Sequence, residues 1–382
     1  MVIIKIQHLV DVMQQIAPLE YAESWDRVGL LVGDTAKEVK GPVLLTIDLS
    51  EQVLQEAITA HAGAIVAYHP PIFDPLTRIT DATPRQRVIL RAIEAGLAIY
   101  SPHTALDAVP GGLTDWLCEG LSGGEMGRIA GDCRALEPHT RLQSTQEVKV
   151  VTFVRPGDVD TIRNSLATSG AGIIGDYKLC SFQTPGVGTF LGGTGTSPAA
   201  GSAGQFESLE ECRLEMVCGK AALPLALDVL RRFHPYEEPA IDVYDLVPQP
   251  RRNAGAGRRL VLDKPMTVAD LTRRLRDFLK RDRMRFALAG PDHPVSRLGV
   301  VPGSGASLSR LARSEGCEAF VTGEMKHHEV MGALNAGMSI ILGNHTSTER
   351  GYLPRLAAKI EHLQPGLRTM VSKVDHDPLV TV

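Results

Sequence analysis

Two hydrophobic patterns alternate along most of the chain. Short apolar runs are typical of strands that are buried on both faces of a sheet. Between them, apolar residues recur every three or four positions, as in amphipathic helices. This alternation predicts parallel strands joined by right-handed helical crossovers. The predicted strands are 43–49, 64–68, 97–101, 295–301, 319–322 and 338–342, and the predicted helices are 6–17, 50–61, 84–95, 113–121, 267–279, one that ends at 336, and 351–360.

The pattern changes in the middle of the chain. Two strand–helix–strand units follow one another there, which predicts a small α+β module inserted into the larger α/β fold. The predicted strands of this module are 148–155, 212–218 and 240–246, and its helices are 158–169 and 221–233.

Two further stretches lack a clear period. Residues 186–204 are rich in glycine and poor in apolar anchors, which predicts a long flexible loop. Residues 251–259 are basic and contain glycine, which favours a hinge. We therefore expect an α/β domain with a mostly parallel sheet, built from residues 1–130 and 251–382 and interrupted by an inserted α+β domain at 131–250.

Composition narrows the class of protein. The chain has 382 residues, of which 43% are hydrophobic and 22% charged, as is usual for a globular protein of two or three domains. The formal net charge of −4 predicts no general attraction to nucleic acid or to anionic membranes. No apolar run approaches the roughly 20 residues of a membrane span.

The cysteines and the first residues bear on the compartment. Six cysteines form no CxxC pair, so we expect reduced thiols in a cytoplasmic protein, with the nucleus or a mitochondrion as alternatives. A disulfide between Cys212 and Cys218 is the competing interpretation. Residues 1–18 resemble neither a signal peptide nor a transit peptide.

Polar side chains with metal-ligand chemistry follow four of the predicted strands. In open α/β sheets, ligands bind beyond the carboxyl ends of the strands, so these residues are expected to share one site. The alternative is a set of hydrogen-bonded loop histidines and helix caps. The residues are His69, then His103 and Asp107, then Glu324 with His327 and His328, and then His345 and Glu349.

The chemistry of these side chains indicates a divalent transition metal. If a helix starts near 346, His345 and Glu349 lie on one face of its first turn. Imidazole and carboxylate ligands suit zinc, manganese, iron or nickel better than calcium or magnesium. A bridging carboxylate can hold two ions about 3.5–4 Å apart, which predicts metal-assisted hydrolysis.

Two other motifs are open to two interpretations each. The pair Trp25–Asp26 is interpreted as a buried ring beside a capping carboxylate, with the wall of a pocket as the alternative. Residues 302–307 follow a predicted strand and are rich in glycine and serine. Their backbone amides could bind an anion, or the segment is a tight strand–helix turn without a ligand.

Taken together, six segments resemble the Ngg-one-interacting-factor-three-like family, whose bacterial members are described as GTP cyclohydrolase type 2-like. The middle of the chain, with the sequence His-Pro-Tyr-Glu-Glu-Pro at 234–239, is similar to the ferredoxin-like (CutA/PII-like) insert of longer members. The six segments are 24–33, 68–73, 101–112, 301–307, 321–328 and 343–353.

The resemblance implies a metal site with two divalent ions per chain. Its ligands would be His69, Asp107, His345 and Glu349, with Glu349 bridging the ions. Tyr68 stands where most bacterial members have a histidine, so Tyr68 itself, His103 or a water would complete the coordination. Arg27 likewise replaces the asparagine that usually follows the Trp-Asp pair.

The resemblance also implies a function and an assembly. The leading hypothesis is a metal-dependent hydrolase that acts on a nucleotide-like substrate such as GTP, with Glu324 and His328 as candidate catalytic residues. The alternatives are a non-enzymatic regulatory scaffold whose partner is a transcription adaptor, and a purely structural metal. The family further implies a homo-oligomer, expected to be a hexamer.

Overall fold

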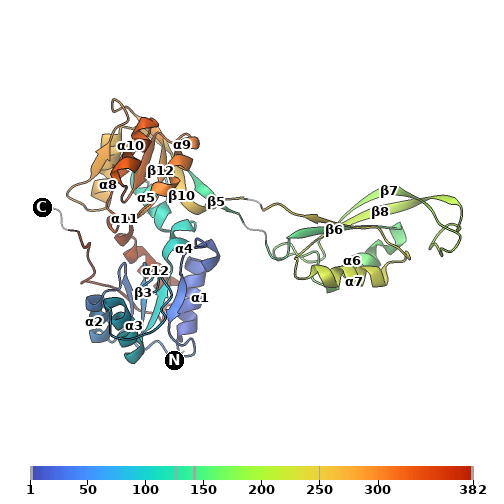
Figure 1. Cartoon of the computed structure of the whole chain (residues 1–382), viewed down its shortest axis with the longest axis horizontal. Coiled ribbons are helices and arrows are strands. Elements are labelled where there is room, and N and C mark those ends of the chain that lie inside the picture. Colours follow the sequence, from blue (N-terminus) through green and yellow to red (C-terminus); the bar gives the residue numbers. More distant parts are fainter. Residues whose placement is uncertain (1–2, 125–126, 141–142, 249, 380–382) are drawn as a thin grey trace. The chain divides into compact units, whose positions relative to one another are not determined.

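The computed structural model describes residues 3–124, 127–140, 143–248 and 250–379. The chain forms two compact units, unit 1 with residues 1–139 and 251–382 and unit 2 with residues 140–250 (Figure 1). No helix in the described part of the chain is long and apolar enough to cross a membrane. All six cysteines are free thiols.

The first sheet of unit 1 has five strands in the order β1-β4-β3-β2-β15. Strand β1 is antiparallel to β4, and the other neighbours are parallel. Every residue of β2, β3 and β4 is buried, as their apolar runs predict. The strands are β1 (Gly29–Val32), β2 (Val43–Thr46), β3 (Ala64–Ala67), β4 (Ala98–Ser101) and β15 (Thr369–Val371).

Helices cover both faces of this sheet. On one face, α2 (Glu51–Thr59) and α3 (Pro84–Glu94) pack against the strands in one hydrophobic cluster. On the other face lie α1 (Ile6–Ile16) and α12 (Leu353–Leu363) (Figure 1). The side chain of Ser50 caps α2 by accepting a hydrogen bond from the amide of Val53, which fixes where this helix starts.

The second sheet of unit 1 has six strands in the order β11-β14-β13-β12-β10-β5. Its central strands β12, β13 and β14 are parallel, whereas β10 and β11 are antiparallel to their neighbours β12 and β14. The strands are β5 (Gly131–Thr140), β10 (Pro250–Met266), β11 (Arg285–Ala287), β12 (Val295–Val300), β13 (Ala319–Thr322) and β14 (Ser339–Leu342).

One hydrophobic cluster joins the two sheets. It contains buried residues of both sheets together with α1, α5 (Leu113–Ser122), α8 (Val268–Phe278) and α12. A separate cluster packs α9 (Ser309–Ser314) and α10 (His327–Asn335) on the opposite face of the second sheet. The expectation of a mostly parallel sheet therefore holds for the first sheet, whereas the second sheet is mixed, with antiparallel strands on both sides of its parallel centre. The four predicted strand ends are divided between the two sheets.

Unit 2 contains a four-stranded sheet with two helices. Its strand order is β7-β8-β6-β9, and all three neighbouring pairs are antiparallel. The chain order β–α–β–β–α–β is that of the split βαβ motif. The elements are β6 (Val148–Val154), α6 (Val159–Thr168), β7 (Phe182–Leu191), β8 (Phe206–Cys218), α7 (Leu223–Phe233) and β9 (Ile241–Asp245).

Two sequence predictions of local structure were wrong. Residues 186–191 are not part of a loop but the second half of β7, which pairs with β8. Residues 251–259 are not a hinge but the first half of β10. Neither stretch shows an apolar alternation, because β7 is an edge strand exposed on both faces and β10 buries small residues and one arginine there.

Candidate metal centre

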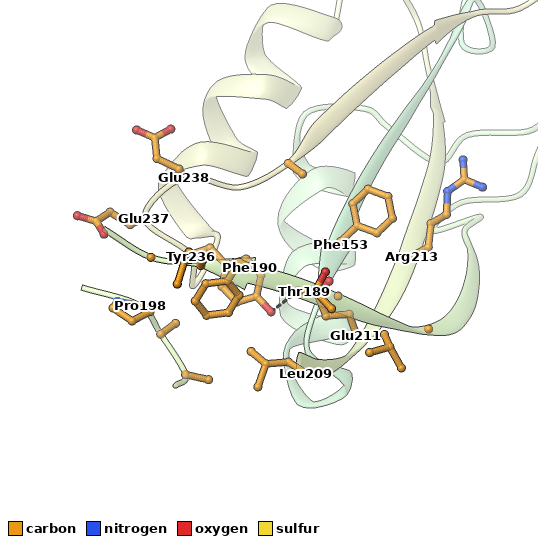
Figure 2. Close-up of a pocket in the computed structure, with 18 of the residues that line it drawn as sticks. Phe153, Thr189, Phe190, Pro198, Leu209, Glu211, Arg213, Tyr236, Glu237 and Glu238 are labelled. Atoms are coloured by element: carbon orange, nitrogen blue, oxygen red, sulfur yellow. Dashed lines mark hydrogen bonds between the residues drawn. The ribbon is translucent and has the colours of Figure 1, made fainter. Parts of the chain in front are cut away.

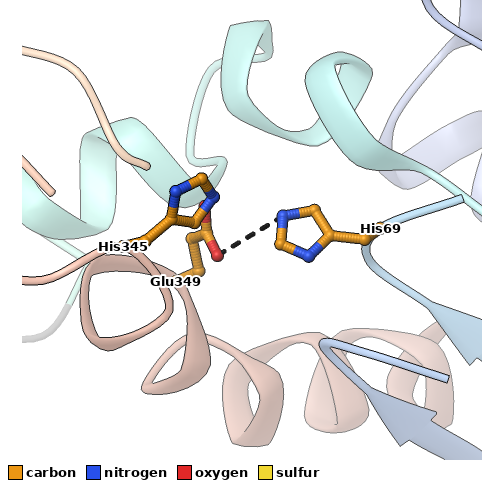
Figure 3. Close-up of side chains that lie close together, drawn as sticks. All are labelled: His69, His345 and Glu349. Carbon is orange, nitrogen blue, oxygen red and sulfur yellow. Dashed lines mark ion pairs between the residues drawn. The ribbon is translucent and has the colours of Figure 1, made fainter. Parts of the chain in front are cut away.

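Three side chains from distant parts of unit 1 converge on one point. His69, His345 and Glu349 each offer a ligand atom, and these atoms all lie within 4.8 Å of one another (Figure 3). His69 follows β3 of the first sheet, whereas His345 follows β14 of the second. The carboxyl ends of strands from both sheets therefore meet at this site.

Local sequence determines how each side chain reaches the site. Pro70 and Pro71 follow His69 and prevent β3 from continuing, because proline offers no N–H to a sheet. Beyond β14, Asn344 adopts a left-handed conformation with φ of 67°, which asparagine tolerates better than most residues. This turn leads into α11 (Ser347–Arg350) and places Glu349 on the same side as His345.

The Glu349 carboxylate lies between the two imidazoles. Its Oε1 is 3.3 Å from Nε2 of His345, and its Oε2 is 3.6 Å from Nε2 of His69. Glu349 is 2% exposed, and its Oε2 has no hydrogen-bond partner among the described residues. A buried carboxylate oxygen without a partner is costly, so a bound cation would supply what the protein lacks here. The donor set of two imidazole nitrogens and a carboxylate fits a divalent transition metal.

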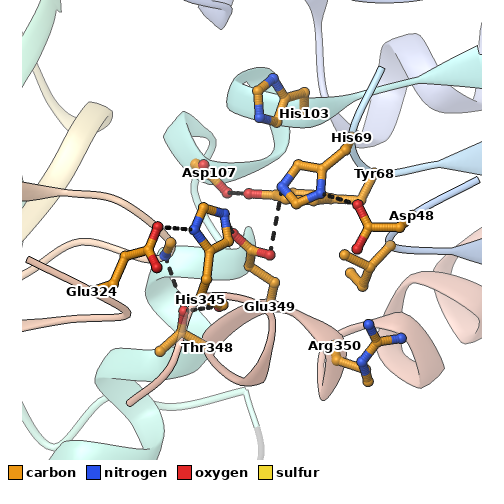
Figure 4. Close-up of polar contacts among 12 residues, drawn as sticks. Asp48, Tyr68, His69, His103, Asp107, Glu324, His345, Thr348, Glu349 and Arg350 are labelled. Carbon is orange, nitrogen blue, oxygen red and sulfur yellow. Dashed lines mark hydrogen bonds and ion pairs between the residues drawn. The ribbon is translucent and has the colours of Figure 1, made fainter. Parts of the chain in front are cut away.

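A second layer of carboxylates orients the imidazoles. Nδ1 of His69 lies 2.9 Å from Asp48 Oδ1, and Nδ1 of His345 lies 2.8 Å from Glu324 Oε1 (Figure 4). Each contact turns the opposite nitrogen, Nε2, toward Glu349. Metal-binding histidines are commonly held by carboxylates in this way.

The same contacts control the charge of His69. Burial alone would lower the pKa of this ring, but the hydrogen bond to Asp48 and the nearby Glu349 carboxylate outweigh burial and raise its pKa to about 10. Burial likewise opposes ionisation of Asp48, yet His69 and Arg350 lower the pKa of that carboxyl. A cation at the site would therefore compete with a proton on His69.

The buried Tyr68 and the half-buried Asp107 form a pair beside the three converging side chains. The hydroxyl of Tyr68 donates a hydrogen bond of 2.7 Å to Asp107 Oδ1 (Figure 4). Burial, reinforced by the negative charge of Glu349, raises the pKa of Asp107 well above its usual range, although the Tyr68 hydrogen bond opposes this. Burial also raises the pKa of Tyr68, so a phenolate ligand is disfavoured.

His103 has its own carboxylate partner. Its Nδ1 lies 2.7 Å from Oδ1 of the buried Asp26, whose Oδ2 accepts a hydrogen bond of 3.1 Å from the amide of Thr104. His103 has a φ of 29°, a strained value for a residue with a side chain. The rings of His103 and His69 are 5.4 Å apart between centroids. The Asp26 carboxylate thus accepts a hydrogen bond from the first turn of α4 (His103–Ala108), in agreement with the capping role expected of it. The expected burial of Trp25 was wrong, because this residue is 54% exposed.

Comparison with known proteins identifies the family. A family model described as Duf34/NIF3 (NGG1p interacting factor 3) matches residues 4–378.

The chain belongs to the Duf34/NIF3 family.

Relatives of the Duf34/NIF3 chain span almost its whole length. It is 29% identical to a GTP cyclohydrolase 1 type 2 homolog of Bacillus subtilis, with 97% of each chain covered. It is 31% identical to NIF3-like protein 1 of Homo sapiens, covering 98% of this chain and 92% of the relative. The solved structure of a Bacillus cereus protein related to NIF3 has a TM-score of 0.66 at 28% identity, over 100% of both chains.

The other residues of this Duf34/NIF3 chain that the sequence assigns to the site either contact one of the three converging side chains or lie away from them. Glu324 contacts His345 from outside. His327 and His328 are exposed in the first turn of α10, and the structure does not bring them to the site. Asp107 contacts Tyr68, which precedes His69. Sequence reasoning did not assign Asp48 to the site. The signal for Asp48 was its place at the end of a predicted strand.

The turn at 302–307 uses its amides internally. The amide of Gly303 donates to Thr348 Oγ1 and that of Gly305 donates to Thr322 Oγ1, each at 3.0 Å. These contacts favour the tight strand–helix turn over the anion site.

Proposed function

We propose that this chain is a metal-dependent hydrolase of a nucleotide-like substrate. The observation that carries the proposal is the Glu349 carboxylate, which faces the Nε2 atoms of His69 and His345 while other carboxylates hold both Nδ1 atoms. The names of the relatives, GTP cyclohydrolase 1 type 2 homologs, support GTP as the first substrate to test.

One divalent ion, zinc, manganese, iron or nickel, would be held by His69, His345 and Glu349. A second ion per chain, with Asp107 as a ligand and Glu349 as the bridge, follows from the family resemblance. That ion would have to share the Asp107 carboxyl with the Tyr68 hydroxyl, which already donates to its Oδ1, and burial disfavours the charged form of this carboxyl. The second position is therefore expected to be the weaker one.

The ion would supply Lewis acidity for the attack of water on the substrate. The residues around the ion would take up the proton that the attacking water loses. His103 is the best placed of them, because Asp26 holds its Nδ1 and leaves Nε2 to take up a proton, the arrangement of a base with an orienting carboxylate. Glu324 and Asp48 orient the ligand histidines, and the exposed His328 has no role in this scheme.

The proposal is tested by metal content and GTP turnover in the full-length chain. Glu349→Gln keeps the shape of the side chain but removes its charge, and should weaken metal binding by at least about 100-fold, since even outer carboxylates contribute 10–100-fold. Turnover should be lost with it. His362→Asn changes an exposed histidine on α12 and is the matched control, with no expected effect. A metal-loaded wild-type protein that hydrolyses no nucleotide would contradict the hydrolase.

A non-enzymatic scaffold is the second candidate. The words "interacting factor" in the family description favour it, as do exposed apolar side chains on the β7–β8 hairpin of unit 2, which suit contact with further copies in a hexamer or with a transcription adaptor. These side chains are Phe182, Val187, Leu191 and Phe206. The β–α–β–β–α–β chain order of unit 2 supports a CutA/PII-like origin for this insert. If His345→Ala with Glu349→Ala abolished metal binding but left a cellular phenotype intact, the scaffold would gain over the hydrolase.

A further inference from the structure

Two aromatic rings are exposed beside the candidate metal centre. Trp25 is 54% exposed and Phe73 is 43% exposed, and their ring centroids are 6.0 Å apart with an interplanar angle of 53°. Tryptophan is highly buried on average, so a half-exposed indole on a folded surface calls for a reason. The other tryptophan, Trp116, is only 6% exposed.

A row of rings connects this indole to the metal centre. The centroid of Trp25 is 6.1 Å from that of His103, which is 5.4 Å from that of His69. The ring of His69 is in turn 5.4 Å from that of His345. Trp25 and Phe73 therefore lie at the rim of the same site, one imidazole away from the proposed ligand His69.

The turn that carries Trp25 is held rigidly. The amide of Asp26 donates to the carbonyl of Glu23 at 3.0 Å, and the amide of Glu23 donates to Thr104 Oγ1 at 3.1 Å. The Asp26 carboxylate is fixed by His103 and Thr104. Because Glu23 is bonded to α4 through its amide and Asp26 through its carboxylate, little ordering remains to be done when a ligand contacts the indole.

We propose that Trp25 and Phe73 form an aromatic platform that binds the planar heteroaromatic base of a nucleotide by stacking. The inference rests on the proposed function and specifies its substrate class: a base on the platform and an anionic part directed toward His69 and His345. Aromatic rings stack with every base, since each base has a π-face. Arg27, which follows on the same turn and is exposed, supplies a positive charge suited to a phosphate.

The surroundings favour a small ligand over a protein partner. The residues that flank the two rings, Ser24, Arg27 and Asp74, are polar and exposed, so the apolar surface is limited to the platform and its edges. A protein interface buries about 800 Å² on each partner, far more than two rings offer.

The first test compares guanosine 5′-monophosphate with ribose 5-phosphate, which differ only in the base. Calorimetric titration of the full-length, metal-loaded protein should give about tenfold weaker binding of the nucleotide in Trp25→Ala, the loss of one stacked base. Binding of ribose 5-phosphate should be unchanged. Phe73→Ala should weaken nucleotide binding in the same direction. Phe286→Ala, which removes another half-exposed ring from unit 1, is the control and should have no effect.

Fluorescence gives an independent readout, because the chain has two tryptophans. The nucleotide should quench the wild type and Trp116→Phe, in which Trp25 is the remaining indole, but not Trp25→Phe. Three results would overturn the platform. In Trp25→Ala, the affinities for guanosine 5′-monophosphate and for ribose 5-phosphate could fall equally, or the subunit number could change. In the wild type, the nucleotide could fail to quench the fluorescence. If the nucleotide stacks on Trp25 but is not hydrolysed, the platform stands and the proposed hydrolase fails. If the nucleotide is hydrolysed and Trp25→Ala leaves its KM unchanged, the hydrolase stands and the platform fails.

Discussion

At the scale of single residues, the pair Tyr68–Asp107 decides how many ions the centre can hold. Tyr68 is buried and Asp107 half-buried, and burial raises the pKa of each. A cation at Asp107 would need the charged carboxylate, which burial disfavours, and would compete with the Tyr68 hydroxyl for it. At Glu349, His69 and His345 no phenol hydrogen bond has to be weakened, although a cation there would compete with a proton on His69.

Replacing Tyr68 should change the metal stoichiometry. We expect one tightly held ion per chain in the wild type and up to two in Tyr68→His, because an imidazole adds a ligand and releases Asp107 from its hydrogen bond. Elemental analysis after dialysis against metal-free buffer measures this directly. Tyr100→Phe is the control, since Tyr100 is also buried but its hydroxyl has no described partner. Two ions in both wild type and Tyr68→His would show that Tyr68 does not hinder the second.

Sequence alone identified the residues that converge, and Glu324 beside them, but not the role of the carboxylates that orient the imidazoles. His69, His345 and Glu349 each follow a predicted strand, but His69 follows a strand of the first sheet and His345 one of the second, so the edge of a single sheet does not account for their meeting. Asp48 and Asp26 occur in positions where a carboxylate usually caps a helix. Only the contacts with His69 and His103 distinguish orientation of an imidazole from capping.

At the scale of elements, the turn between α7 and β9 is built on one neutral histidine. Nδ1 of His234 accepts a hydrogen bond of 3.1 Å from the amide of Tyr236. Its Nε2 lies 3.3 Å from Thr152 Oγ1, whose own proton goes to the carbonyl of Ala240. Burial lowers the pKa of His234, and a backbone contact with Phe153 and nearby acidic groups oppose this only in part. A second proton would break the bond from Tyr236.

Unit 2 should therefore lose stability in acid. A histidine whose folded pKa lies below its unfolded value of about 6.5 contributes fully above that value, and its contribution falls as pH decreases through the folded pKa. Chemical denaturation of the full-length chain between pH 5 and 8, followed by hydrogen exchange of the amides of unit 2, should show this decline, since both tryptophans lie in unit 1 and their fluorescence reports on that unit. In His234→Gln the slope in this window should be flatter. Equal slopes in the two proteins would argue against His234 as the source.

The elements that sequence reasoning missed share a physical cause. β7 is an edge strand, so neither face needs the apolar alternation that reveals a strand, and glycines interrupt it. In β10 the buried side includes Ala254 and Arg258, which is 1% exposed. Arg258 is held by Asp115 and by backbone carbonyls on both sides. A buried arginine in a basic stretch cannot be distinguished from a solvated one without these contacts.

At the scale of the whole molecule, the cores of the two units are separate. One hydrophobic cluster consists only of residues of unit 2, and the other three consist only of residues of unit 1. The metal ligands and their outer carboxylates all belong to unit 1. The expected division at 130/131 stays a prediction; β5, which begins at Gly131, pairs within the second sheet of unit 1.

Removing residues 140–250 should leave the metal centre intact. β5 and β10 are neighbours in one sheet, with Gly131 packed on Val261 and Gly255 on Glu137, so they run antiparallel and His139 ends close to Arg251. Adjacent strands lie about 4.8 Å apart, and a hairpin loop of about 2–5 residues spans that gap. The shortened chain should unfold cooperatively and bind its first ion within about threefold of the wild-type affinity, because the three converging side chains and the hydrophobic cluster that joins the two sheets belong to unit 1.

Thermal unfolding followed by circular dichroism and metal titration measure both expectations. A full-length chain with the same loop residues inserted after His139 controls for the linker itself. A shortened chain that folds but has lost its ion would mean that unit 2 supplies part of the site. Light scattering of the same proteins separates assembly from metal binding. If the exposed apolar side chains of the β7–β8 hairpin drive self-association, the subunit number falls on excision while the metal stays.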